Sequence, residues 1–110
     1  MKGLIIRSPW IDKILIGEKI WEIRGTATKI RGRIFLIKSG TGKIFGEVKL
    51  VDCFELDTKT YSSSSDKHGI PAASSLPYKK TYAWVLEAPV RYENPIPYKH
   101  PSGAVIWVNI

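Results

Sequence analysis

The stretch Gly17-Glu-Lys-Ile-Trp-Glu-Ile-Arg24 alternates in side-chain character from one residue to the next. In an extended chain, apolar Trp21 and Ile23 fall on one face, and charged Glu22 and Arg24 fall on the other. This alternation predicts a β-strand over residues 18–24. It also places a carboxylate and a guanidinium on the same face, where they can pair with each other or bind a ligand.

The residues before this strand predict another strand and a short helix. Lys2–Arg7 carries an apolar run, and Ser8 stands where an N-cap would satisfy free backbone N–H groups. Pro9 fits the first helical position, and Gly17 fits the end of the helix. Between them, apolar residues recur at helical spacing, namely Trp10, Ile11, Ile14 and Leu15. The helix should therefore have about two turns.

Further strands are expected later in the chain. Alternating or apolar runs cover residues 31–38, 44–54, 81–87 and 104–110, and Ser39–Gly42 has the composition of a hairpin turn. Residues 56–80 include four consecutive serines and show no clear period, so they predict a long mobile loop that could contain a short helix. Pro89, Pro95, Pro97 and Pro101 are expected to punctuate an extended passage between the last two strands.

Length and composition favour a single domain over residues 1–110. Hydrophobic residues make up 44% of the chain and charged residues 25%, which is ordinary globular usage. The predicted elements give a mainly β (α+β) fold of five to six strands with one or two short helices. A small closed or nearly closed barrel is the expected architecture, because it leaves few sheet edges exposed. The longest apolar runs have five residues, so no membrane partner is expected.

An excess of positive charge points to an anionic partner. The formal net charge is +7, and residues 1–50 carry 11 basic and 4 acidic side chains. A basic stretch in this half predicts contacts with the phosphates of RNA or single nucleotides, and DNA is also possible. The alternative is a solvated face that serves solubility alone. The stretch comprises Arg24, Lys29, Arg31, Arg33 and Lys38.

The chain has no pattern for a metal or another cofactor, so neither is expected. Its soft ligands are Cys53, His68 and His100, and none lie at metal-binding spacing. A single cysteine cannot form an intramolecular disulfide, which favours a reducing compartment and a cytoplasmic protein. Cys53 is expected to be a core residue. His68 is either an ordinary loop residue or a proton shuttle.

Aromatic residues offer candidates for stacking on a nucleobase. Trp10, Tyr82 and Trp84 are predicted to contribute, whereas Trp21 and Trp107 are expected in the core. Trp10 is the best placed of them, because it lies beside Ser8 at the start of the predicted helix.

Lys19 and Glu22 are the candidate polar residues of a binding or catalytic site. Lys19 could contact phosphate or, if desolvated, act as a base, and Glu22 could accept a hydrogen bond from an amino group or activate water. In a regular strand the two side chains face opposite sides. They can share a pocket only if the strand begins after Lys19 or carries a bulge.

Several motifs recur in one order along the chain. They are Ser8-Pro-Trp10, Gly17–Arg24, Arg31-Gly-Arg-Ile34, Gly46-Glu-Val, Tyr82-Ala-Trp-Val85 and Gly103 followed by Trp107-Val. In this order they resemble the ASCH domain family, within the wider PUA-like group, over nearly the whole chain. The resemblance implies a small β-barrel with helices at its mouth. It also implies a cleft linked to RNA or modified nucleosides, and kinship with domains of transcription coactivators.

Two branches of this family imply enzymatic activity. One consists of amidohydrolases that remove the acetyl group from N4-acetylcytidine, with a lysine of a Gly-x-Lys motif, a threonine three residues later and a loop glutamate. Lys19 matches the lysine, Glu22 stands in place of the threonine, and Asp66-Lys-His68 offers no glutamate. The other branch consists of ribonucleases, for which no catalytic set maps onto this chain.

Three hypotheses follow. The preferred one is a domain that binds RNA or a nucleotide in a cationic cleft lined by Trp10, Lys19, Glu22 and Arg24. The second is a hydrolase that acts on a modified nucleoside or on RNA, with Lys19 and Glu22 as catalytic residues. The third is a protein-interaction module that pairs through an exposed edge strand or the passage Pro95–Pro101.

Overall fold

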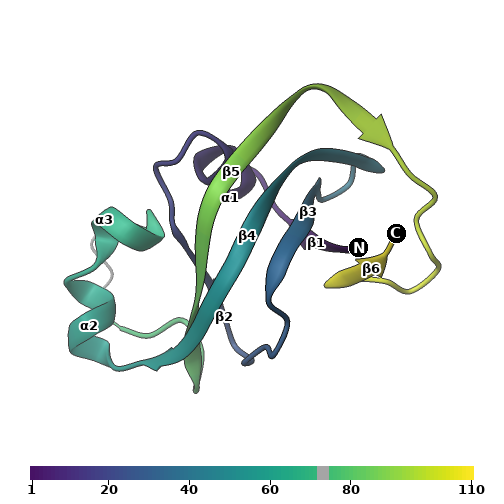
Figure 1. Cartoon of the computed structure of the whole chain (residues 1–110). Coiled ribbons are helices and arrows are strands. Elements are labelled where there is room, and N and C mark those ends of the chain that lie inside the picture. Colours follow the sequence, from purple (N-terminus) through teal and green to yellow (C-terminus); the bar gives the residue numbers. More distant parts are fainter. Residues whose placement is uncertain (72–74) are drawn as a thin grey trace.

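The computed structural model describes residues 1–71 and 75–110, which contain six strands and three short helices (Figure 1). The strands are β1 (Lys2–Ile6), β2 (Trp21–Arg24), β3 (Gly32–Lys38), β4 (Lys43–Leu56), β5 (Thr81–Pro97) and β6 (Trp107–Asn109). The helices are α1 (Trp10–Leu15), α2 (Thr58–Ser62) and α3 (Ser65–His68). The expected mainly β fold with short helices is confirmed, with three helices in place of one or two.

All six strands belong to one sheet, in the order β2-β5-β4-β3-β1-β6. β1 and β3 are parallel, and every other neighbouring pair is antiparallel. Within the described residues, β2 and β6 pair with one neighbour each, so the sheet is open, and of the closed or nearly closed barrel expected from the sequence the closed form is not found. These edge strands have only four and three residues, and short edges discourage pairing with other chains.

The start of β2 differs from the prediction. The strand begins at Trp21, because the two residues after Gly17 belong to the turn that follows α1. The backbone N–H groups of Glu18 and Lys19 both donate to the Lys13 carbonyl, at 3.0 and 3.1 Å. Gly17 adopts a positive φ of 86°, which allows this tight turn at low cost.

The prolines after residue 88 do not interrupt β5. This strand runs for 17 residues and pairs with β4 as far as Pro97, whereas the sequence predicted an end at Glu87. β2 covers only residues 82–85 of the other side of β5. Beyond that point this side has no neighbouring strand among the described residues, so a proline without an N–H is tolerated there. Figure 1 shows β4 and β5 arching together toward the C-terminal segment.

Helices α2 and α3 lie within the segment predicted as a long loop. Asp57 caps α2, since its carboxylate accepts a hydrogen bond of 2.7 Å from the Thr60 N–H. Gly69 ends α3 in the left-handed conformation. Residues 72–74, which also belong to the predicted mobile loop, lie outside the described residues.

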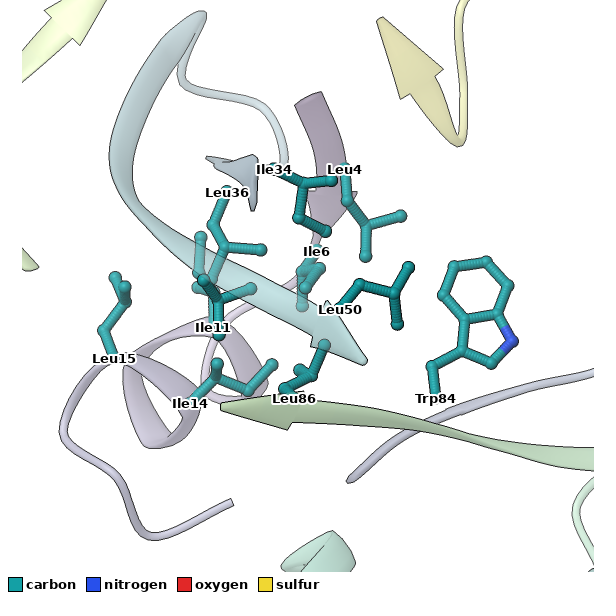
Figure 2. Close-up of a cluster of buried hydrophobic side chains, with 11 residues drawn as sticks. Leu4, Ile6, Ile11, Ile14, Leu15, Ile34, Leu36, Leu50, Trp84 and Leu86 are labelled. Atoms are coloured by element: carbon teal, nitrogen blue, oxygen red, sulfur yellow. The ribbon is translucent and has the colours of Figure 1, made fainter. Parts of the chain in front are cut away.

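The main apolar core lies where α1 packs on the sheet, and Figure 2 shows its side chains. It is formed by Leu4, Ile6, Ile11, Ile14, Leu15, Ile34, Leu36, Val48, Leu50, Trp84 and Leu86. Trp107 stacks on Trp84 with ring centroids 5.8 Å apart, and half-buried Cys53 packs against the same cluster. A second cluster under α2 and α3 contains Trp21 and Tyr61. The tryptophans at 21 and 107 are therefore core residues, as expected.

Gly46 is required where the paired strands β4 and β5 pack against α1. A Cβ atom at this position would lie 2.3 Å from the Val90 carbonyl oxygen and 2.6 Å from Leu15 Cδ2. Gly46→Ala is expected to lower the free energy of unfolding by about 1–3 kcal/mol, because backbone must move. Gly3→Ala is the control in urea denaturation, since it meets only the methyl ends of Ile37 and Ile110, and it should cost less. Equal losses for the two variants would contradict this explanation.

Candidate functional site

A single cavity of about 880 Å³ contains four of the residues that the sequence singled out, namely Trp10, Lys19, Glu22 and Arg24. Its walls come from the α1–β2 connection, the end of β1, the turn between β3 and β4, and the segment before β6. A cavity of this volume is large enough for a small organic ligand.

Lys19 is the most unusual residue of this cavity. Its side chain is buried, with the whole residue 2% exposed, and its Nζ donates a hydrogen bond to the His68 carbonyl. Nζ also lies 3.8 Å from Glu22 Oε1 and 5.3 Å from the centre of the Trp10 ring. Burial lowers the pKa of Lys19 from 10.5 to about 8, although the nearby Glu22 carboxylate opposes this shift.

Glu22 is held in a fixed orientation by Arg24. Its Oε2 accepts a hydrogen bond from Arg24 Nε at 2.9 Å and also lies 2.8 Å from Nη2. The same Nη2 donates to the Ile5 carbonyl at 2.9 Å, which anchors the guanidinium to β1. Oε1 accepts no hydrogen bond within the described part of the chain, so a donor on a ligand can use it.

Lys19 and Glu22 lie together because β2 starts late. The residues up to Lys19 form the end of the α1 turn, and the alternation of faces applies only from Trp21 onward. The backbone N–H of Ile20 then donates to the Lys67 carbonyl at 2.8 Å, which joins this connection to α3. The sequence allowed a shared pocket if the strand began after Lys19 or carried a bulge, and the structure shows the first of these arrangements.

Trp10 begins α1 and is half-buried at the cavity wall. The ammonium groups of Lys13 and Lys19 lie 5.4 and 5.3 Å from its ring centre. Ser8 does not cap this helix as predicted, because its hydroxyl donates to Asp12 Oδ2 at 2.8 Å. Ser8 is also absent from the cavity wall, so only Trp10 of this pair can contact a ligand there.

The other two predicted stacking residues lie outside the cavity. Trp84 is 1% exposed, and its Nε1 donates to the Thr26 carbonyl at 2.9 Å. One face of its ring packs against Trp107, and the Arg24 guanidinium lies 5.6 Å from its centre. Tyr82 is half-buried against the same core. The alternation of β5 carries these two side chains inward, so the prediction that Trp84 stacks on a base is wrong.

The remaining basic residues of the predicted stretch also lie away from the cavity. Arg33 pairs with Glu47 at 2.7 Å, and Lys38 pairs with Asp12 at 3.1 Å. Arg31 donates to carbonyls of its own loop, and Lys29 is exposed. Two of the basic residues predicted to contact phosphate, Arg33 and Lys38, are therefore paired with acidic residues that are distant in the sequence.

His68 has a structural role in the fold. It is fully buried and stacks on Tyr61 with ring centroids 4.6 Å apart. Its Nδ1 accepts a hydrogen bond from the Ile70 N–H at 3.0 Å, so Nε2 carries the hydrogen and donates to the Tyr61 carbonyl at 2.7 Å. Because both nitrogens are occupied away from solvent, the proton-shuttle hypothesis is wrong.

Five further polar or aromatic residues line the cavity and were not predicted, namely Arg7, Ser39, Tyr78, Tyr98 and His100. The Tyr98 hydroxyl and His100 Nδ1 are hydrogen-bonded at 2.7 Å. No local pattern marks these residues, because the fold brings them to the cavity from four separate segments, directly after β1, directly after β3, before β5 and between β5 and β6. Among the described residues, no three His, Cys, Asp or Glu side chains lie together as a metal site would require.

An open six-stranded sheet, three short helices and a charged cavity beside them define a small α+β domain. Residues 4–96 match the ASCH domain in a comparison with protein families, and the chain belongs to this family. The predicted resemblance is confirmed. A search of curated proteins finds none that matches significantly. None of the described helices is long and apolar enough to cross a bilayer.

Solved structures of an ASCH protein from Zymomonas mobilis are similar to this fold. One covers 87% of this chain and 72% of that chain, with a TM-score of 0.67 and 19% identity. Two point mutants of the same protein give TM-scores of 0.70 and 0.71 with 16% and 15% identity. They cover 87% and 99% of this chain, and 74% and 87% of theirs. At such identities the likeness shows the fold alone.

The buried ammonium group gives a direct prediction for titration. We expect Lys19 to titrate at a pKa of about 8 when the lysine side chains are followed by NMR, with its signal assigned by its loss in Lys19→Met. Glu22→Gln should lower this pKa further, because the carboxylate stabilises the charged form. A Lys19 pKa that stays near 10.5, or rises in Glu22→Gln, would contradict the geometry.

Proposed function

We propose that this ASCH domain binds RNA or single nucleotides and receives one unpaired base in the cavity. The observation that carries the proposal is the convergence of Trp10, Lys19 and Glu22 on one hollow. An aromatic face, a cationic donor and a carboxylate acceptor are the three kinds of group that proteins use to hold an unstacked base.

The polar groups of the site match the edge of a base. Glu22 Oε1 can accept a hydrogen bond from an amino or imino group, and the neighbouring Lys19 ammonium can donate to a ring nitrogen or carbonyl. Because Arg24 fixes Glu22, the acceptor does not need to be ordered when a ligand binds.

Charge supports an anionic ligand. The net charge of +7 attracts polyanions at long range, and we place this binding in the cytoplasm, where a protein with one cysteine remains reduced. RNA is the expected polymer, and single-stranded DNA is the comparison in the test.

Binding is tested by the anisotropy of labelled single-stranded RNA and DNA oligomers at about 50 and 200 mM salt. We expect affinity to fall with salt and Trp10→Leu to weaken binding by about 1–3 kcal/mol, the contribution of a stacked base. Phe54→Leu is the matched control, because Phe54 is a partly exposed aromatic outside the cavity, and it should bind as the wild type does.

Binding should also weaken as pH rises through about 8, since Lys19 then loses its charge. The absence of binding at low salt, or equal losses in Trp10→Leu and Phe54→Leu, would rule out the proposal.

Hydrolysis is the second candidate function, and the depressed pKa of Lys19 favours it. With a pKa of about 8, part of Lys19 is a neutral amine near neutral pH and could accept a proton from water beside Glu22. N4-acetylcytidine and a mixed RNA are the substrates to test. An enzyme should lose at least about a hundred-fold in rate in Lys19→Met, whereas equal turnover by wild type and variant would exclude Lys19 as the catalytic residue.

A further inference from the structure

The cavity is larger than one base requires, and its wall contains two groups of polar residues. Lys19, Glu22 and Arg24 contact one another and form the first group. Arg7, directly after β1, and the turn Ser39–Gly42 between β3 and β4 form the second group, and we call these groups the first and second ends of the cavity.

The Arg7 guanidinium is free to bind a ligand. Its side chain is exposed and forms no hydrogen bond or ion pair with the described residues, whereas Arg24 is occupied by Glu22 and the Ile5 carbonyl. The Arg7 backbone is nevertheless fixed, since its carbonyl accepts a hydrogen bond of 3.1 Å from the Ile11 N–H. At this part of the cavity wall, Arg7 therefore combines a fixed backbone with a positively charged side chain that has no partner among the described residues.

The β3–β4 turn brings backbone donors to the same end. The Ser39 N–H donates to the Ile6 carbonyl at 2.9 Å, which places the turn beside Arg7. Gly40 and Gly42 have φ values of 82° and 66°, and their N–H groups have no partner within the described residues. A Cβ at either glycine would meet nothing within 4 Å, so a ligand can approach this backbone. Free N–H groups beside a guanidinium are a common setting for a phosphate.

The balance of charge along the cavity supports an anion at this end. Three of the lining residues are lysine or arginine, and Glu22 is the one carboxylate in the wall that the described residues form. This carboxylate already interacts with Lys19 and Arg24. The charge of Arg7 is therefore not compensated within the cavity.

We propose that Arg7 and the Ser39–Gly42 turn bind a phosphate of the nucleotide whose base lies between Trp10 and Glu22. The ligands are then nucleotides and RNA in preference to free nucleosides. The proposal rests on the proposed function and deepens it. Arg24, which orients Glu22, is hydrogen-bonded to the Ile5 carbonyl. Arg7 lies two residues after Ile5, which is about 7 Å along an extended chain. This separation is comparable with that between a base and its own phosphate.

The experiment compares the four common ribonucleosides with their 5′-monophosphates by isothermal titration calorimetry. The wild type should bind a monophosphate about ten-fold or more tightly than its nucleoside, the effect of a charge-assisted hydrogen bond. Arg7→Gln should reduce this ratio to near one and leave nucleoside affinity unchanged. Arg31→Gln is the matched control, since it removes an exposed positive charge outside the cavity and should keep the ratio.

The outcomes separate the two proposals. Equal affinity of the wild type for nucleosides and monophosphates would overturn the phosphate site and leave base binding standing. An equal reduction of the ratio in both arginine variants would assign the effect to net charge and would also overturn the site. If neither nucleosides nor nucleotides bind, this inference fails, and the oligomer titration alone then decides whether the domain binds RNA.

Discussion

The burial of the Lys19 ammonium group is the constraint on which the site depends. An ammonium group removed from water needs an acceptor and a compensating charge, and here the His68 carbonyl accepts its hydrogen bond while the Glu22 carboxylate lies 3.8 Å away. Two other carbonyls at the end of α3 accept hydrogen bonds from neighbouring residues. The Lys67 carbonyl accepts from the Ile20 N–H at 2.8 Å, and the Gly69 carbonyl accepts from Lys13 Nζ at 3.4 Å. One short helix is thus fastened by its last carbonyls to the connection that leads into β2.

Such a cluster is expected to contribute little to stability, because the desolvation of buried charges offsets their attraction. The effect of the cluster is to fix the orientation of the Glu22 and Lys19 side chains. Arg24 holds Glu22 against β1, and α3 holds Lys19 at the end of the α1 turn, so donor and acceptor are ordered before a ligand arrives. A site arranged in this way avoids the entropic cost of ordering flexible side chains on binding.

The elements with regular alternation were predictable from the sequence, and those fixed by distant partners were not. β3 and most of β4 follow from local pattern, as does the shared face of Glu22 and Arg24. The start of β2 does not, because it depends on the turn bonded to the Lys13 carbonyl and on the hydrogen bond from Ile20 to the Lys67 carbonyl of α3. The pairing of Arg33 with Glu47 depends on strand register, which composition cannot reveal. Arg7 was missed for the same kind of reason, since only the closing of the chain around the cavity distinguishes it from other exposed cations.

The depth of the polar groups limits the form of any nucleic acid that can use this site. Glu22 is 6% exposed and Lys19 is 2% exposed, so a base must enter the cavity to reach them. A base in a duplex presents its Watson–Crick edge to its partner and is stacked on both faces, so it cannot enter without first being extruded. Net charge would attract double and single strands alike, but under the proposed function the cavity would accept only a base that is already unpaired or is easily flipped. Selection among nucleic acids would therefore depend on local strand structure before it depends on sequence.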